Sequence, residues 1–233
     1  MNKLVIFDFD GTITDEDQNI WKMLWQEVGY DTSINSLYRN LFISHVVKQE
    51  ITRKDWFDKT RDAFIEKNMT KQTMRNVASK IHLNRQFKDL AQFLREKDYY
   101  IVILSGGITN IIRFVLDDCN DFVPMVVSTR AKFNNEGKFI DFSISDYDFE
   151  GKAKFVDILK ERFNISSKNI VFVGNGQNDE WVCNTGCYTV CINPNETDSE
   201  NKKIWKEHIK ELKDLKNVIL NLEKNKEEYV IFE

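Results

Sequence analysis

The sequence predicts an α/β fold: a doubly wound parallel sheet with a helical cap inserted after the first strand. A short apolar run near the amino terminus, residues 4–7, ends at carboxylates. Residues 15–87 then show helical periodicity without strand signals, and from residue 88 onward helix and strand patterns alternate. We therefore expect a core domain of residues 1–14 and 88–233 and a cap domain of residues 15–87.

The first strand carries the leading candidate site. Its sequence, Leu-Val-Ile-Phe, has the continuous apolarity of a strand buried on both faces, and Asp8 and Asp10 follow it with Phe9 between them. Alternate side chains of an extended segment share a face, so both carboxylates should point one way and the Phe9 ring the other. Ligands of open parallel sheets bind at the carboxyl ends of strands, although Asp-Phe-Asp-Gly is also typical of an ordinary turn.

The segment from residue 15 to 87 is expected to form four or five short helices. Apolar residues recur there at helical spacings, for example Ile20, Leu24 and Val28, and no proline interrupts them. These helices fall between the first strand and the second, which makes them an insertion. Beside the end of a catalytic strand, such a unit would act as a lid that excludes water and selects substrates.

The alternating part predicts the rest of the sheet. Strands are expected at residues 99–104, 122–128, 169–173 and 188–192, and helices at residues 84–97, 108–116 and 151–163. The four turn formers from Asn134 to Gly137 predict a hairpin. After the last expected strand, residues 188–192, charged helices are expected to the end, because the tail of residues 198–228 keeps an apolar stripe: Ile204, Ile209, Leu212, Leu215, Ile219 and Leu222.

Composition narrows the function classes. The 233 residues are enough for a substantial core. With 33 Lys plus Arg against 37 Asp plus Glu, the formal charge of -4 disfavours a nucleic-acid partner or an anionic membrane. The first strand begins too early to leave room for a signal peptide, and no apolar run approaches a membrane span. We expect a soluble, cytoplasmic monomer or homodimer.

Four cysteines, Cys119, Cys183, Cys187 and Cys191, raise the question of a metal cluster. The last three are four residues apart, which is not the two-residue gap of usual zinc or iron-sulfur ligands. Buried, reduced thiols are the favoured interpretation.

Polar residues gather at the later strand ends. They are Ser105, Gly106, Gly107, Asn175, Asn178 and Asp179, and Lys152 opens a predicted helix just upstream of the last three. Together with the first aspartates they suit phosphoryl transfer: a carboxylate nucleophile, oxygen ligands for Mg²⁺, and a lysine, a hydroxyl and free backbone N–H groups around the phosphoryl oxygens. The alternatives are ordinary: Ser105 would cap the next helix, and Lys152 would be solvated, with Lys154 as a nearby rival.

Four ordered segments, residues 8–14, 104–107, 151–154 and 173–179, resemble the motifs of the haloacid dehalogenase superfamily. The most similar branch is the phosphoserine-phosphatase-like one, subfamily IB, and the likeness covers nearly the whole chain, including the helical cap and the hairpin before the lysine. The resemblance implies a Rossmann-like core and a Mg²⁺-dependent phosphatase that hydrolyses a small phosphomonoester through an aspartyl phosphate.

The resemblance also implies residue roles. Asp8 would be the nucleophile, and Asp10 the general acid and base, which also gives its backbone carbonyl to the metal. Ser105 and Lys152 would bind the phosphoryl group. The remaining implied contacts are Gly106, Gly107 and Asn178 for the substrate, and Asp8, Asp10, Asn175 and Asp179 for the metal.

One motif residue departs from the family pattern. Asn175 stands where the family usually has an aspartate that ligates the metal. An asparagine can still coordinate through its carbonyl oxygen, but the lost charge should weaken Mg²⁺ binding. We expect an active enzyme with a high metal requirement.

The substrate is less well defined by the sequence. In phosphoserine phosphatases a cap arginine and a glutamate after the first motif hold the amino-acid end. Arg61 lies at a fitting place in the cap, and Asp17 stands at the glutamate position, but both are equally explained as exposed surface charges. The first motif also resembles phosphatases of methionine salvage and of phosphocholine, so we predict a small phosphomonoester rather than phosphoserine itself.

Two other functions compete with hydrolysis. A phosphotransferase would pass the phosphoryl group to an acceptor alcohol instead of water. A catalytically weak binding protein would retain the fold and have lost its first ligand at Asn175, but the presence of Asp8, Asp10, Ser105 and Lys152 counts against it. Dehalogenation is disfavoured because that chemistry needs neither the second aspartate nor a metal.

Overall fold

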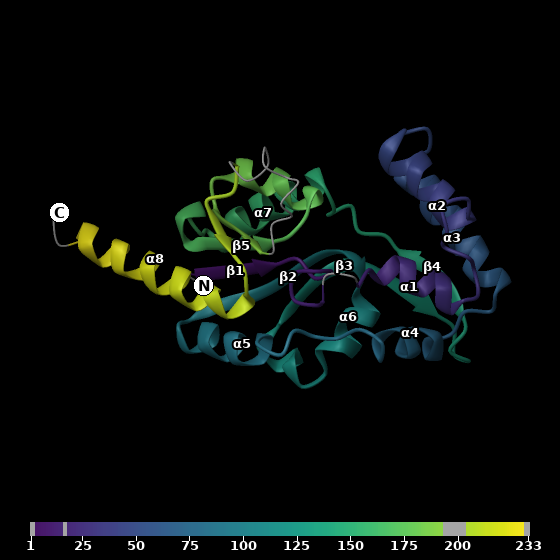
Figure 1. Cartoon of the computed structure of the whole chain (residues 1–233), viewed down its shortest axis with the longest axis horizontal. Coiled ribbons are helices and arrows are strands. Elements are labelled where there is room, and N and C mark those ends of the chain that lie inside the picture. The colour runs from purple at the N-terminus through teal and green to yellow at the C-terminus, as the bar shows by residue number, and fades with distance from the viewer. Residues whose placement is uncertain (1–2, 16–17, 193–203, 231–233) are drawn as a thin grey trace.

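The computed structural model describes residues 3–15, 18–192 and 204–230, without the side chains of residues 177 and 225–230. One sheet of seven strands runs through it in the order β4-β3-β2-β1-β5-β6-β7 (Figure 1). The strands are β1 (Lys3–Phe7), β2 (Tyr99–Ile108), β3 (Met125–Phe133), β4 (Phe139–Ser143), β5 (Ile170–Gly174), β6 (Tyr188–Ile192) and β7 (Glu207–Ile209). All neighbours are parallel except β3 and β4, which confirms the predicted α/β class.

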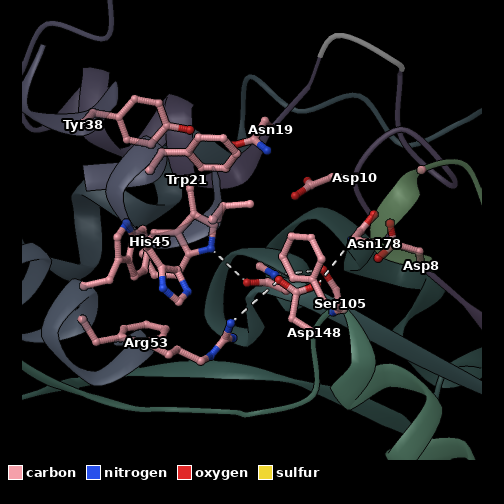
Figure 2. A pocket seen from close by; sticks show the side chains of 18 of the residues that line it. Asp8, Asp10, Asn19, Trp21, Tyr38, His45, Arg53, Ser105, Asp148 and Asn178 are labelled. Carbon is pink, nitrogen blue, oxygen red and sulfur yellow. Dashed lines mark hydrogen bonds and ion pairs between the residues drawn. The ribbon is translucent and has the colours of Figure 1, made fainter. Parts of the chain in front are cut away.

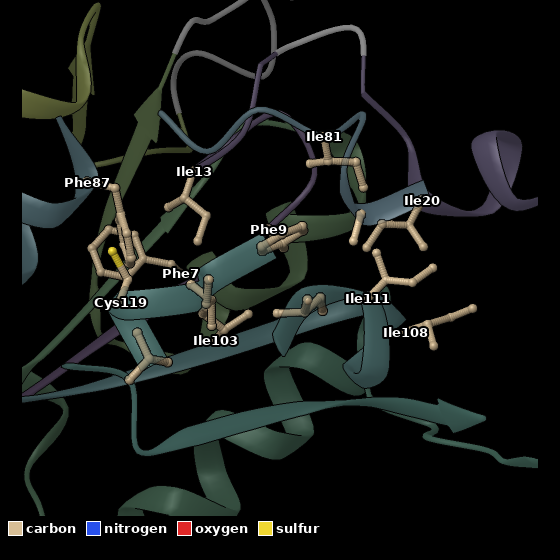
Figure 3. Packing of buried hydrophobic residues seen from close by; sticks show 14 of the residues in the cluster. Phe7, Phe9, Ile13, Ile20, Ile81, Phe87, Ile103, Ile108, Ile111 and Cys119 are labelled. Carbon is tan, nitrogen blue, oxygen red and sulfur yellow. The ribbon is translucent and has the colours of Figure 1, made fainter. Parts of the chain in front are cut away.

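Helices cover both faces of this sheet. They are α5 (Phe87–Glu96), α6 (Thr109–Leu116), α7 (Glu150–Phe163) and α8 (Leu215–Val230). Side chains of β1 alternate between the two layers: Val5 and Phe7 pack in one cluster with residues of α5, α6 and α8, and Leu4 and Ile6 in another with residues of α7. The doubly wound arrangement is therefore confirmed, and Figure 3 shows Phe7 in the first cluster.

The strand register brings the predicted site segments to one edge. Phe7 of β1 is paired with Ile103 of β2 on one side and with Val173 of β5 on the other. The next residue, Asp8, donates its backbone N–H to the Val173 carbonyl oxygen at 2.9 Å. The three chain segments that follow these positions therefore lie side by side, as expected for the ligand-binding edge of a parallel sheet.

Between β1 and β2 the chain forms the predicted set of short helices. They are α1 (Ile20–Glu27), α2 (Leu37–Phe42), a π-helical segment (Ile43–Val47), α3 (Arg53–Glu66) and α4 (Lys71–Ala78). Each α-helix begins after a residue whose side-chain oxygen accepts a backbone N–H of the first turn: Asn19, Ser36, Thr52 and Thr70. Such caps satisfy N–H groups that have no partner within the helix, and they fix where each helix starts.

The predicted hairpin is present and belongs with these helices. β3 and β4 join through a turn that closes with the Gly137 N–H donating to the Asn134 carbonyl oxygen at 3.0 Å. Phe139 and Phe142 of β4 pack edge-on against Phe64 of α3, with ring centroids 6.2 and 6.1 Å apart. The hairpin thus forms a wall against which the inserted helices pack, a relation that the sequence did not indicate.

The carboxy-terminal part differs from the prediction of charged helices. Residues 198–203 of the predicted tail lie outside the described residues, and β7 follows as an edge strand parallel to β6. Only from Leu215 does the chain form α8. Trp205 and Ile209 pack into the two different clusters on opposite faces of the sheet, which one helical stripe cannot do.

Two further expectations concern membrane-spanning helices and the four cysteines. No helix in them combines the length and the apolarity needed to cross a bilayer. All four cysteines are reduced; Cys183 is half-buried, the other three are buried, and no His, Cys, Asp or Glu group in this part of the chain is arranged as a metal cluster. The prediction of buried thiols is therefore confirmed for three of the four.

Candidate active site

Asp8 and Asp10 lie at the end of β1 and line a pocket of about 670 Å³. Phe9, between them, is fully buried in the apolar cluster (Figure 3) and does not line the pocket. Burial raises the pKa of Asp8 to about 7, although Lys152 opposes the rise. Burial and the neighbouring Asp8 raise the pKa of Asp10 well above its usual value.

Lys152 is the buried cation of the site. Its side chain is 0% exposed, and Nζ contacts Asp8 Oδ1 at 2.7 Å and Asp179 Oδ1 at 2.6 Å. Burial alone would lower the pKa of Lys152, but the two carboxylates outweigh it and raise the pKa. The residue before it, Gly151, has no room for a side chain, because a Cβ there would overlap the carbonyl oxygen of Asp146. Lys154, the sequence rival, is exposed and pairs with Glu150.

Ser105, Gly106 and Gly107 form the second wall of the site, within the last part of β2. Ser105 Oγ is buried and accepts the Gly107 N–H at 3.0 Å, so it does not cap α6, whose N-cap residue is Ile108. A Cβ on Gly106 would overlap the Asp148 carboxylate. The missing side chain at Gly106 therefore permits the Asp148 carboxylate to approach the backbone of this wall.

The loop after β5 is held together by Asp179. Its Oδ2 accepts the N–H groups of Asn175 at 3.0 Å and Gly176 at 3.3 Å, and its Oδ1 contacts Lys152. With both oxygens engaged and 0% exposure, Asp179 does not line the pocket. Asn175 does line it, and its Oδ1 accepts a hydrogen bond from Thr12 at 3.3 Å.

The far side of the pocket comes from the inserted helices. Its residues there are Trp21, Tyr38, Phe42, His45, Val46, Arg53, Trp56 and Phe57. Figure 2 shows Tyr38, Trp21, His45 and Arg53 facing Asp8, Asp10, Ser105 and Asn178 across the pocket. Trp21 spans the two sides, because its Nε1 donates to the Gly106 carbonyl oxygen at 2.9 Å.

Comparison with known proteins identifies the family. Residues 2–182 match the model of haloacid dehalogenase-like hydrolases. The chain belongs to this family.

Curated relatives of this hydrolase are named phosphoserine phosphatase. The human enzyme is 30% identical over 104 residues, which are 44% of this chain and 45% of that protein. The enzyme from Archaeoglobus fulgidus is 23% identical over 214 residues, 89% of this chain and 58% of that protein. The matched segments thus span only about half the length of these relatives.

Solved structures share the fold of this hydrolase. A phosphoserine phosphatase with a phospho-aspartyl intermediate analogue superposes with a TM-score of 0.68 at 15% identity, covering 94% of this chain and 98% of that chain. A substrate-bound phosphoserine phosphatase superposes with a TM-score of 0.67 at 14% identity, covering 95% and 98%.

The family implies a divalent metal, and the residues of this hydrolase fit one. Three buried or pocket-lining carboxylates, Asp8, Asp10 and Asp179, share the single charge of Lys152, so the site has surplus negative charge. Suitable oxygen donors are the Asp8 carboxylate, the Asp10 backbone carbonyl and Asn175 Oδ1. Asp179, predicted as a ligand, instead binds Lys152 and the loop backbone, so its contacts favour a supporting role.

Arg61, the predicted substrate contact in α3, is not brought to the pocket. Arg61 does not line it and pairs with Asp58 and Asp62, each at 2.9 Å. Arg53, the first residue of α3, lines it instead and donates from Nη2 to the Ser145 carbonyl oxygen at 2.8 Å. Eight residues correspond to roughly 12 Å along a helix and about 80° around it, so the two arginines occupy different surfaces.

The two remaining predicted substrate contacts differ in outcome. Asp17 lies outside the described residues, and its neighbours Gln18 and Asn19 line the pocket. Asn178 also lines it and donates from Nδ2 to Asp148 Oδ1 at 3.3 Å. Sequence reasoning missed Arg53, because the Thr52 capping box marks where α3 begins but does not indicate which face of the helix meets the pocket.

Proposed function

We propose that this hydrolase is a Mg²⁺-dependent phosphatase of small phosphomonoesters that acts through an aspartyl phosphate on Asp8. The observation that carries the proposal is the convergence of three separate segments: Asp8, Asp10 and Ser105 line one end of one pocket, and the buried Lys152 contacts Asp8 directly behind it. Each supplies a group that phosphoryl transfer needs. The names of the curated relatives support the same reaction class.

In the first step a carboxylate oxygen of Asp8 attacks phosphorus, and the bond from phosphorus to the leaving oxygen breaks. Lys152 holds Oδ1 of Asp8 at 2.7 Å, which leaves Oδ2 to attack. Asp10, with its raised pKa, is suited to carry a proton and to give it to the leaving oxygen, so that the product leaves as a neutral alcohol.

In the second step a water molecule attacks the phosphorus of the aspartyl phosphate and the Asp8–phosphorus bond breaks. Asp10, now deprotonated, takes the proton of that water, so the acid of the first step is the base of the second. Inorganic phosphate leaves, and both carboxylates return to their starting states.

The phosphoryl oxygens are held by the other side chains. Ser105 and the N–H groups of Gly106 and Gly107 lie on one side, and Lys152 supplies a positive charge on the other. Mg²⁺, when bound by Asp8, the Asp10 carbonyl and Asn175, would offset the negative charge between nucleophile and phosphate. With an amide in place of a carboxylate, this set should bind the metal weakly.

The division into domains follows from the same site. Residues 15–87 would form the cap and residues 1–14 and 88–233 the core, with the pocket between them. The aromatic side of the pocket comes from α1, α2, the π-helical segment and α3, which supports a lid function for this unit.

The test is phosphate release from a panel of phosphomonoesters with Mg²⁺. The wild type should turn over at least one ester, and Asp8→Asn should be inactive. Protein quenched in acid during turnover should carry one phosphoryl group on Asp8 by mass spectrometry. Asp62→Asn, a change of an exposed aspartate outside the pocket, is the matched control. Activity that survives in Asp8→Asn would refute the covalent mechanism.

A further inference from the structure

The pocket has two chemically different ends. At one end lie the carboxylates and the phosphoryl-binding residues already described. At the other lie the aromatic rings of Trp21, Tyr38, Phe42, Trp56 and Phe57. An alcohol group joined to a phosphate held at Asp8 has to occupy this aromatic end, so the character of these rings selects the alcohol.

The rings form a fixed surface. Trp21 packs edge-on against Trp56, with centroids 4.8 Å apart and planes at 85°, and against Phe57 at 5.6 Å and 72°. Trp56 and Phe57 contact each other at 4.9 Å and are 8% and 2% exposed. The Trp21 indole is also tied to the Gly106 carbonyl. A surface held in this way binds a flat apolar group without paying to order its own side chains.

Charge at this end is limited, and Arg53 is only partly engaged, because its buried Nε makes no hydrogen bond. Among the described residues that line it from the inserted helices, Arg53 is the one permanently charged side chain. Its guanidinium donates to the Ser145 carbonyl and lies 3.9 Å from Asp148. The Asp148 carboxylate beside it also lines the pocket, so a quaternary ammonium group would meet charges of both signs and gain no net attraction from this pair. A zwitterionic amino-acid alcohol would leave most of the apolar surface uncovered.

The volume of the pocket also favours a large alcohol group. Its volume of about 670 Å³ falls in the range of roughly 300–1,000 Å³ in which proteins hold ligands the size of drugs. A phosphorylated two- or three-carbon alcohol fills only a small part of such a space. The aromatic wall therefore has room for a ring or a comparably large flat group beyond the ester oxygen.

We propose that the preferred substrates are phosphomonoesters of alcohols that carry an aromatic or other flat apolar group, which lies against Trp21, Trp56 and Phe57. The inference rests on the proposed phosphatase function and names its substrate class. It separates this hydrolase from an enzyme for amino-acid phosphates or for phosphocholine.

The experiment compares 2-phenylethyl phosphate with ethyl phosphate, which share a primary alkyl ester and differ in the ring. We expect kcat/KM to favour the phenyl ester by at least about 10- to 200-fold, because a single methylene in an apolar pocket already contributes that much. In Trp56→Leu this ratio should fall several-fold. It should stay unchanged in Phe114→Leu, a change of a 40% exposed ring outside the pocket. The ratio of the two kcat/KM values is independent of the fraction of folded enzyme, so a partly unfolded variant still measures the preference for the ring.

The following results would contradict the inference or the proposed function. A ratio near one in the wild type, or faster turnover of phosphoserine or phosphocholine than of the phenyl ester, overturns the inference. If no ester is hydrolysed, the proposed function fails instead. Calorimetry of 2-phenylethylphosphonate and ethylphosphonate with the wild-type protein then tests the aromatic preference by itself, and equal affinities would refute it.

Discussion

Replacing Lys152 with methionine should destabilise the protein and abolish its activity. Lys152 is fully buried and contacts Asp8 and Asp179 at 2.7 and 2.6 Å, so its loss leaves two buried carboxylates without their cation. Removing one partner of a buried ion pair costs about 3–5 kcal/mol. For a chain of this length each kcal/mol moves the melting temperature by about 2–4 °C, which gives roughly 6–20 °C.

Within these ranges we expect a loss of stability near the lower limit. Burial already raises the pKa of Asp8 to about 7, so in Lys152→Met this carboxylate can take up a proton at modest cost near neutral pH. One uncompensated charge, on Asp179, then remains. We expect a loss near 3 kcal/mol and a melting temperature lower by about 6–12 °C.

The assay is thermal unfolding with a chelator present, followed by phosphate release with Mg²⁺. Lys154→Met is the matched control: Lys154 lies two residues along the same helix, is exposed, and pairs with Glu150 at 3.0 Å. Exposed pairs of this kind contribute about 0.3–0.5 kcal/mol, so the control should melt within about 2 °C of the wild type and remain active. If the two variants melted alike, the buried triad would not have the energetic role described.

Three further changes test other parts of the site. Asn175→Asp should lower the Mg²⁺ concentration for half-maximal activity by about 10-fold and lower the melting temperature of the metal-free protein, because it adds a negative charge to the site; an unchanged Mg²⁺ requirement would remove Asn175 from the ligand set. Trp21→Phe should lose the hydrogen bond to Gly106 and lower kcat about 5- to 10-fold with a similar melting temperature. An unchanged kcat would show that this hydrogen bond does not contribute to catalysis. Gly151→Ala should lower stability by about 1–3 kcal/mol in urea unfolding, since its methyl group would overlap the Asp146 carbonyl; wild-type stability would show that the turn can relax.

The sheet was predictable because its strands are buried on both faces. A strand such as β1, covered by helices on each side, has to be apolar along its whole length, and that pattern is visible in one sequence. β7 was missed because an edge strand of three residues in a charged stretch carries no such signal. Its pairing with β6 is decided by the opposite packing of Trp205 and Ile209, which is a tertiary effect.

The site was predictable to the extent that its residues sit at strand ends. Asp8 and Asn175 directly follow β1 and β5, and Ser105 lies in the last part of the adjacent strand β2, so the topology alone brings them to one edge. The hydrogen bonds of Asp179 depend on the backbone conformation of the loop after β5. Whether Arg53 or Arg61 lines the pocket depends on the rotation of α3 about its axis. The aromatic wall was not predicted because its rings come from three separate helices, α1, α2 and α3, and look, in sequence, like ordinary core residues.

The first turn of α1 links the inserted helices to the chemistry. The Ile20 N–H donates to Asp10 Oδ1 at 3.4 Å, and the next residue, Trp21, donates to the Gly106 carbonyl at 2.9 Å. One helix end thus contacts both the proposed acid and the phosphoryl-binding loop, and it also supplies part of the aromatic wall. A displacement of α1 relative to the sheet has to break both bonds at once, so an alcohol group that holds Trp21 in place also holds Asp10 and Gly106 in the arrangement that phosphoryl transfer requires.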